Sequence, residues 1–151
     1  MSICFENRDA LQCLLDSSIR LRRLIIRDAA DNLIISCKAD RMDIHGIVIN
    51  AEYPGGLKYL NFEQISRIGN TILPRSVQML TFIDCATTAT LVNQISEAIN
   101  SEQVGTAQIK TFKFQNRLMT SRCPEYIRAI KNLWIALRRK RVLNIHFFPD
   151  Y

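Results

Sequence analysis

Apolar and polar residues recur along this chain in a phrase of six positions, apolar-x-x-apolar-x-apolar. The clearest copy occupies residues 77–82, VQMLTF, and further copies begin at residues 21, 44, 57, 109 and 142. Alternation at every second position is typical of a β-strand with one buried face. The pattern predicts six strands, and most intervals between the copies fall in the range of short repeat units.

Three segments show helical spacing instead. Residues 1–19 are predicted as a helical cap, because leucines and an isoleucine recur there at helical intervals. Residues 86–108 are predicted to hold a helix capped by Thr88 or Thr90, and residues 117–141 a helix that Ser121 caps and Pro124 opens. The apolar stripes of these two helices are Leu91, Val92, Ile95, Ala98 and Ile99, and then Ile127, Ile130, Leu133, Trp134 and Leu137.

The part of the chain between residues 21 and 56 is less regular. Residues 21–28 are predicted as a strand, residues 33–37 as a β-rich run that forms a local hairpin with it, and residues 44–51 as another strand before the turn YPGG at 53–56. The copies at 44 and 57 lie too close for a repeat unit, so one strand stands outside the repeat or its register differs. With 151 residues, we expect one domain: a cap at 1–20, an irregular β-rich part at 21–56 and a repeat-like part at 57–151.

A strand with one apolar face must bury that face, and stacking such units side by side builds a parallel sheet. The apolar positions of the phrase would then point inward. In the repeat-like part these are Leu57, Leu60, Phe62, Val77, Leu80, Phe82, Ile109, Phe112, Phe114, Val142, Ile145 and Phe147.

The stretch Val77-x-x-Leu80-x-Phe82-x-x-Cys85 resembles the strand segment of leucine-rich repeats, LxxLxLxxN or LxxLxLxxC. The unit at 57, with Leu73-Pro74 in its return, is similar to the short bacterial or FNIP-type repeats, and the units at 77 and 109 resemble the longer, helix-bearing type. The resemblance covers residues 57–147. It implies an α/β solenoid with parallel strands on one face and helices or loops on the other, in which Cys85 is a buried turn anchor. The alternative is a general α/β domain whose strands share an alternating pattern.

Composition places few limits on function. Apolar residues make up 48% of the chain and charged residues 23%, as in ordinary globular proteins, and the net charge of +6 permits contact with nucleic acid without requiring it. The five cysteines are odd in number and include no CxxC pair. Without a signal-like N-terminus or an apolar run of membrane-spanning length, we expect a reduced, cytoplasmic protein, with the nucleus as the alternative and no membrane contact.

No motif in the sequence indicates catalysis. The two histidines, His45 and His146, lie far from the cysteines, and no phosphate-binding glycine motif or metal-ligand spacing occurs. The aspartates at 28, 31, 40 and 43 are interpreted as solvated loop carboxylates. We therefore expect a non-enzymatic protein with no metal, no cofactor and no small-molecule substrate.

The outward strand positions would form a concave surface that mixes apolar and polar side chains. Such a mixture suits a protein or peptide partner, so a binding or scaffold module is the first hypothesis; a merely solvated surface is the alternative. The predicted partner-binding residues are Tyr59, Asn61, Met79, Thr81, Ile83, Thr111, Lys113, Asn144, His146 and Phe148.

Two clusters of basic residues support a second hypothesis, a basic accessory subunit or factor of a ribonucleoprotein such as the ribosome. Their side chains could contact RNA phosphates, although a solvated strand face and a helix C-terminus would explain them equally well. The clusters are Arg20, Arg22, Arg23 and Arg27, and Arg138, Arg139, Lys140 and Arg141.

Overall fold

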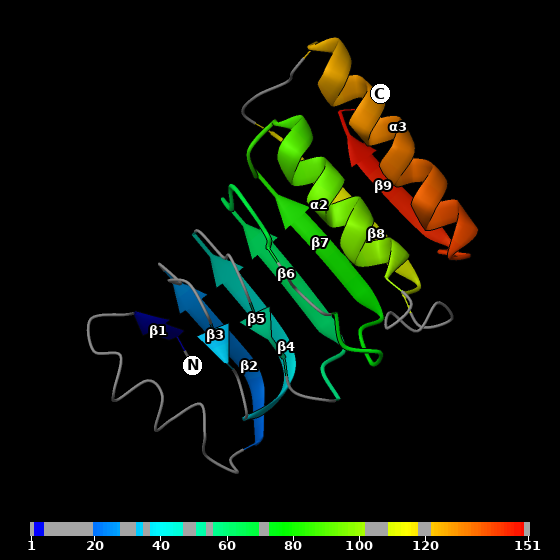
Figure 1. The fold of residues 1–151 in the computed structure, drawn as a ribbon. Coiled ribbons are helices and arrows are strands. Elements are labelled where there is room, and N and C mark those ends of the chain that lie inside the picture. The colour runs from blue at the N-terminus through cyan, green and yellow to red at the C-terminus, as the bar shows by residue number, and fades with distance from the viewer. Residues whose placement is uncertain are drawn as a thin grey trace.

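A computed structural model describes residues 2–4, 20–27, 33–34, 37–46, 51–53, 56–69, 73–101, 109–117 and 122–149. The protein is α/β, with a main sheet of seven strands, a small sheet of two strands and two helices (Figure 1). The main sheet comprises β1 (Ser2–Cys4), β2 (Arg20–Arg27), β4 (Lys38–His45), β6 (Tyr59–Glu63), β7 (Met79–Ile83), β8 (Thr111–Gln115) and β9 (Asn144–Phe148). The small sheet comprises β3 (Leu33–Ile34) and β5 (Ala51–Glu52), and the helices are α2 (Ala89–Asn100) and α3 (Pro124–Arg139).

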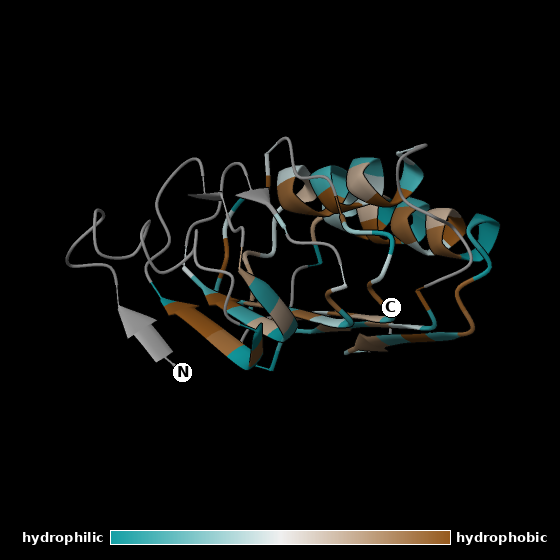
Figure 2. Ribbon diagram, turned by 90° about the horizontal axis from the view of Figure 1, so that it is seen from below, coloured by the Kyte–Doolittle hydropathy of each residue, from teal (hydrophilic) through white to brown (hydrophobic). Residues whose placement is uncertain are grey.

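The strands of the main sheet follow one another in chain order. Every ladder between neighbouring strands of this sheet is parallel. Figure 2 shows α2 and α3 together on one side of the sheet, where they cover the ladder from β7 to β9. The described part of the chain therefore has two layers, with the core between the helices and the sheet.

Equivalent positions of the repeated phrase lie side by side in the sheet. Leu60 is paired with Leu80, which is paired with Phe112, and Phe62 is paired with Phe82, which is paired with Phe114. The rings of Phe62 and Phe82 stack with centroids 5.0 Å apart, and the aromatic row continues to Phe114 and Phe147 at spacings of 6.2 and 6.1 Å. The twelve inward positions predicted from the sequence are confirmed: all are buried except Ile145 and Phe147, which are partly buried against the core.

The prediction of a strand over residues 44–51 is wrong in register. The observed strand is β4, Lys38–His45, and its copy of the phrase is Ala39-x-x-Met42-x-Ile44, with all three apolar side chains buried. The first four copies then begin at residues 21, 39, 57 and 77, which gives nearly even units of 18 to 20 residues. The β-branched run after Ile44 favoured the later register, but Gly46, with φ of +95°, ends the strand before that run.

One prediction for the N-terminal part also fails. β2 does not form a hairpin with residues 33–37; it pairs in parallel with β1 and β4, while β3 pairs in parallel with β5. Within the predicted helical cap, residues 2–4 form strand β1, and residues 5–19 lie outside the described residues, so the helix there stays a prediction. Within the predicted turn at 53–56, residues 54 and 55 lie outside the described residues as well.

One turn geometry recurs where the strands end. The residue that follows β4, β6, β7 or β8 donates its backbone N–H to the last carbonyl of the next strand of the sheet. The four donors and acceptors are Gly46 to Glu63 (3.2 Å), Gln64 to Ile83 (3.0 Å), Asp84 to Gln115 (2.7 Å) and Asn116 to Phe148 (2.8 Å). Three of these donors, Gly46, Gln64 and Asp84, have positive φ angles, so the chain leaves successive strands in the same way.

Both predicted helices in the second half of the chain are present. In α2 the five predicted stripe residues are buried, and Oγ1 of Thr88 caps the helix by accepting from the backbone N–H of Leu91 at 3.3 Å. In α3 the N-cap is Cys123 and not Ser121, which lies outside the described residues. The stripe of α3 buries Tyr126, Ala129, Ile130, Leu133, Ala136 and Leu137, and Trp134 lies on its exposed side. Among the described helices, none has the length and apolar content needed to span a membrane.

Candidate functional site

The outward strand positions form the face of the main sheet opposite α2 and α3, which we call the open face. Register places them in three rows that cross β6, β7, β8 and β9. The rows are Tyr59, Met79, Thr111 and Asn144; Asn61, Thr81, Lys113 and His146; and Glu63, Ile83, Gln115 and Phe148. All ten predicted partner-binding residues lie in these rows, and the largest of them are well exposed: Tyr59 at 43% and Phe148 at 56%.

The open face continues onto β4 and β2. Arg23 is paired with Arg41, which is paired with Tyr59, and Ile25 is paired with Asp43, which is paired with Asn61. The sequence analysis missed Arg41, and its interpretation of Asp43 as a solvated loop carboxylate is wrong. Asp43 lies in the middle of β4 and is 1% exposed. The signal that would have found both residues is the copy of the phrase at 39–44, because it places them at outward positions.

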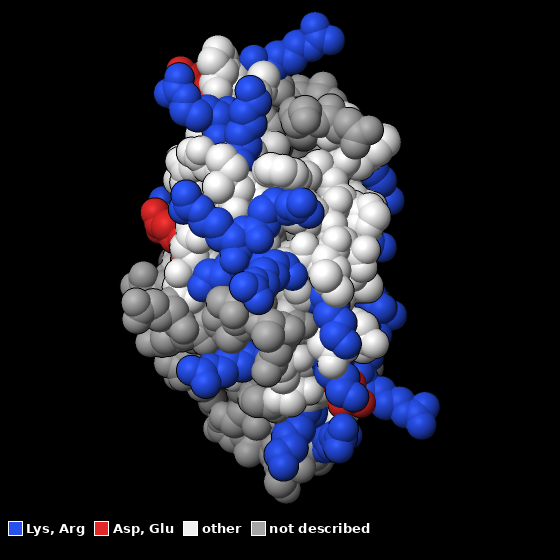
Figure 3. Space-filling view, turned by 90° about the vertical axis from the view of Figure 1, so that its right-hand side faces the viewer, with Lys and Arg blue, Asp and Glu red and all other residues white. Residues whose placement is uncertain are grey.

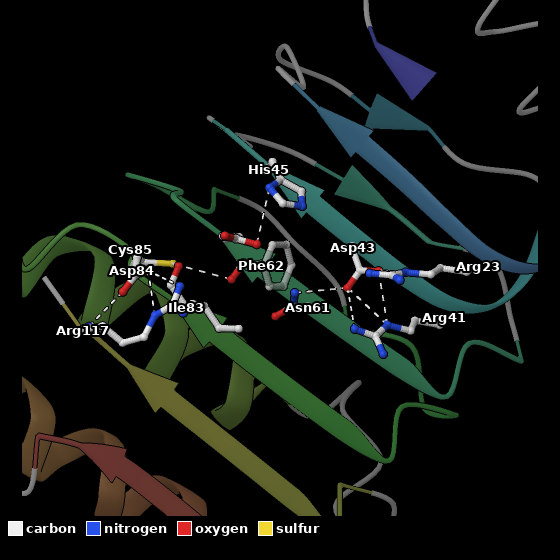
Figure 4. A network of polar contacts seen from close by, with 11 residues as sticks. Arg23, Arg41, Asp43, His45, Asn61, Phe62, Ile83, Asp84, Cys85 and Arg117 are labelled. Carbon is white, nitrogen blue, oxygen red and sulfur yellow. Dashed lines mark hydrogen bonds and ion pairs between the residues drawn. The ribbon is translucent and has the colours of Figure 1, made fainter. Parts of the chain in front are cut away.

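Asp43 is the centre of a polar network on the open face (Figure 4). Its carboxylate accepts from Nε of Arg23 at 2.5 Å, from Nε and Nη2 of Arg41 at 3.2 and 3.1 Å, and from Nδ2 of Asn61 at 3.1 Å. Both arginine side chains stay about half exposed while they hold the buried carboxylate. The network fixes two guanidinium groups on the surface, because each is anchored from beneath.

Burial alone would raise the pKa of Asp43, but the hydrogen bonds from Arg41, Arg23 and Asn61 outweigh it and hold that pKa below its usual value. The carboxylate is therefore ionised at neutral pH and compensates one of the two arginine charges. Oδ1 of Asn61 is buried and has no hydrogen-bond partner among the described residues.

A shallow depression of about 170 Å³ lies beside this network, across β4, β6, β7 and β8. Its polar lining comes from the predicted residues Asn61, Thr81 and Lys113 and from Arg41 and Gln115. Tyr59, Met79 and Ile83 supply apolar surface. The complete lining is Arg41, Tyr59, Leu60, Asn61, Met79, Thr81, Ile83, Lys113 and Gln115. The open face is thus hollowed at its centre, with cations at Arg41 and Lys113.

The end of β7 is fixed by an ion pair and a thiol. The carboxylate of Asp84 accepts from the backbone N–H of Arg117 at 2.8 Å and from Nη2 of the same residue at 2.6 Å. These hydrogen bonds hold the pKa of Asp84 below its usual value. Cys85 is buried, as predicted, and its thiol donates to the carbonyls of Ile83 and Phe62 at 3.4 and 3.8 Å. Burial raises the pKa of Cys85 to about 12, so the thiol stays protonated and inert.

The structure does not bring the two basic clusters together. β2 is the second strand from one edge of the main sheet, whereas α3 connects the two strands at the other edge. The first cluster is itself divided, because Arg23 and Arg27 lie on the open face while Arg20 forms an ion pair with Asp40 at 3.0 Å. The second cluster surrounds the C-terminal end of α3: Arg138 and Arg139 occupy the last turn, Lys140 is the C-cap and Arg141 follows in a turn with φ of +58°. The clusters are separate surfaces.

Among the described residues, the cysteines at 37, 85 and 123 are free thiols. Within the same residues no group of three or more histidine, cysteine, aspartate or glutamate side chains is arranged to hold a metal ion. His45 lies 3.5 Å from Glu63, measured from Nδ1 to Oε2, and His146 is exposed in the middle row of the open face.

No family model matches this chain, and no curated protein or solved structure matches it either. Its function is therefore inferred from the residues of its own surfaces.

Proposed function

We propose that this protein is a non-enzymatic binding module, a short solenoid of leucine-rich-repeat-like units that holds a protein partner on its open face. The observation that carries the proposal is the continuous set of in-register rows across β6 to β9, which no described helix covers. Regular rows give a partner a lattice of side chains with a fixed spacing between strands.

The architecture supports the solenoid part of the proposal. The strands follow chain order, equivalent apolar positions stack on one another, and the same turn ends β4, β6, β7 and β8. These properties are typical of proteins in which each unit contacts only its neighbours. The short units of β2 and β4 and the longer, helix-bearing units of β7 and β8 then differ only in their return segments.

The composition of the open face supports a protein partner. Tyr59, Met79, Ile83 and Phe148 provide apolar and aromatic surface, and interfaces between proteins are enriched in such side chains. Amides, hydroxyls and a lysine separate them, so the surface offers hydrogen bonds as well as contact area. Tyrosine and arginine are also common among the residues that dominate binding energy.

The polar network adds a point of specificity at the β4 side of the face. Because Asp43 fixes the guanidinium groups of Arg23 and Arg41, a partner carboxylate could bind them with little loss of side-chain freedom. Lys113 lies on the other side of the depression. The partner segment that fits this site carries an acidic side chain next to apolar ones.

Affinity capture from a nuclease-treated lysate tests the proposal. The wild-type chain is compared with Tyr59→Ala and Ile83→Asp on the open face, and with Glu97→Ala on the exposed side of α2 as the matched control. The expected result is a set of proteins that withstands nuclease and moderate salt, is lost with both open-face variants and is kept with the control. Proteins that the open-face variants retain would contradict the proposal.

A ribonucleoprotein role is the second candidate, and one observation favours it. Figure 3 shows basic side chains spread over one whole face of the molecule, with few acidic ones among them. RNA binding through phosphates would weaken steeply with salt, and neutralising Arg138, Arg139, Lys140 and Arg141 together would abolish it. Binding to an RNA oligonucleotide that is unchanged by both treatments would exclude this role.

A further inference from the structure

Beyond the open face, the edge of the sheet at β9 carries a second surface that no other described strand or helix covers, which we call the end face. It contains a hollow of about 360 Å³ lined by Ile130, Lys131, Trp134 and Ile135 of α3 and by Phe147 of β9. Trp134 and Ile135 are 47% and 42% exposed. Exposed side chains of this size rarely gather on the surface of a monomer without a partner.

The hollow lies where the internal rows of the sheet end. The row of Leu60, Leu80 and Phe112 ends at Ile145, and the row of Phe62, Phe82 and Phe114 ends at Phe147. Both terminal residues are only partly buried, while their equivalents in β6, β7 and β8 are fully buried. A strand added beside β9 would extend each row by one position, and an apolar side chain at that position would find space beside Ile145 or Phe147.

The backbone of β9 offers hydrogen bonds at the same place. Asn144 donates its N–H to Lys110, and Phe148 accepts from Asn116, so alternate residues of β9 direct their backbone groups toward β8. By the alternation of a β-strand, the N–H and carbonyl groups of Ile145 and Phe147 point toward the free edge. The residues with the partly buried side chains are thus also those whose backbone groups face outward.

The charge of the end face selects the kind of occupant. Lys131 lines the hollow, Arg138 lies over the ring of Trp134 at 5.4 Å from its centroid, and Arg128, Arg139 and Arg141 are exposed on the same helix and its end. A second copy of the chain would bring two such surfaces together, and the resulting repulsion disfavours it.

We propose that the end face binds an extended, acidic peptide segment of another protein, which adds to β9 as a further strand. Two apolar side chains at alternate positions of the segment would pack beside Ile145 and Phe147 and enter the hollow against Trp134. Acidic residues of the segment would lie near Lys131 and Arg138. RNA would satisfy the charges but would use neither the apolar hollow nor the free edge of the strand.

Selection from a displayed library of random peptides tests this inference directly. The wild-type chain is the bait, and the selected peptide is then measured against Trp134→Ala and Ile135→Glu, with Tyr59→Ala as a control of similar exposure on the open face. We expect acidic peptides with alternating apolar residues, whose affinity falls about tenfold or more with the two end-face variants and changes little with the control. Circular dichroism verifies that each variant is folded.

Backbone methylation of the selected peptide separates strand addition from simple filling of the hollow. Two methylated peptides are compared, one with methyl groups on the odd-numbered amide nitrogens and one with them on the even-numbered nitrogens. Only one of the two should lose binding, because a strand presents every second N–H to its neighbour. Four results would overturn the inference: no enrichment, equal binding of both methylated peptides, displacement of the peptide by a single-stranded RNA oligonucleotide with higher affinity for the end face, or a dimer of the chain that Trp134→Ala dissociates.

Discussion

Asn61 on β6 and Asp43 on β4 are direct neighbours across a parallel ladder, and Nδ2 of Asn61 donates to Oδ1 of Asp43 at 3.1 Å. Together with Arg23 and Arg41, this pair makes the buried polar centre of the open face. We expect Asp43→Asn to lower the free energy of unfolding by about 1–3 kcal/mol, because two arginines lose their anchoring charge. Urea denaturation followed by circular dichroism measures the change.

The matched control for that substitution is Asp40→Asn on the same strand, where the ion pair with Arg20 is more exposed to solvent. It should change stability by about 0.5 kcal/mol or less. Equal effects of the two substitutions would show that the network around Asp43 has no special role in holding the face together.

Stability should fall when the pH drops below about 4. The pKa values of Asp43 and Asp84 are held below their usual value in the folded chain, and the unfolded carboxyls titrate near 4, so the unfolded state binds protons first as the pH falls. The stabilisation is complete above the unfolded pKa and is lost as the pH falls through the folded pKa values. Urea denaturation between about pH 7 and about pH 3 measures it, and Asp43→Asn should flatten the dependence. Identical pH profiles for the variant and the wild type would contradict the assignment.

The recurrent turn predicts different effects on stability for two similar substitutions. Gln64 and Asp84 both adopt positive φ, 55° and 49°, which is strained for residues other than glycine. Gln64→Gly should raise the free energy of unfolding by about 0.5–1 kcal/mol, because the exposed glutamine contributes little else. Asp84→Gly relieves the same strain but removes the ion pair with Arg117, so it should be less stabilising than Gln64→Gly or destabilising. Thermal unfolding of the two variants in parallel makes the comparison, and the reverse order would be inconsistent with the turn geometry.

The aromatic row should be most sensitive at its centre. Phe82 is buried between Phe62 and Phe114, and Phe82→Ala should lower the free energy of unfolding by about 3–5 kcal/mol. Phe147 ends the row and is only partly buried, so Phe147→Ala should have a clearly smaller effect. Urea denaturation gives both values. A larger loss at Phe147 would mean that the end face is packed against the core more tightly than the structure indicates.

The inner face of the sheet could be predicted from the sequence because its signal is strong and local. Leu80, Phe82 and their equivalents repeat at fixed offsets, and burial follows directly from that spacing. The helix stripes were equally clear, except at Ile127, which is only partly buried, and at Trp134, a large apolar residue that lies on the solvent side of α3. Three smaller or more polar residues, Tyr126, Ala129 and Ala136, take its place in the core.

The polar centre of the open face could not be predicted because one register was wrong. In the copy at 39–44 the first apolar position is Ala39, a small residue, and the aspartates and arginine around it are typical of a loop. Strand β4 is stabilised by its parallel ladders with β2 and β6. Arg23 and Asn61, which lie on those neighbouring strands, come next to Asp43 only after the chain has folded. Ion pairs between residues 20 positions apart leave no local pattern.

Site-specific photo-crosslinking tests the central claim, that the open face holds the partner. A photo-reactive phenylalanine derivative replaces Thr81 at the centre of the open face or, as the control, Glu97 on the exposed side of α2. We expect a discrete protein adduct from position 81, with partner peptides identified by mass spectrometry, and none of that adduct from position 97. Equal adducts from both positions, or no protein adduct from position 81, would contradict the claim.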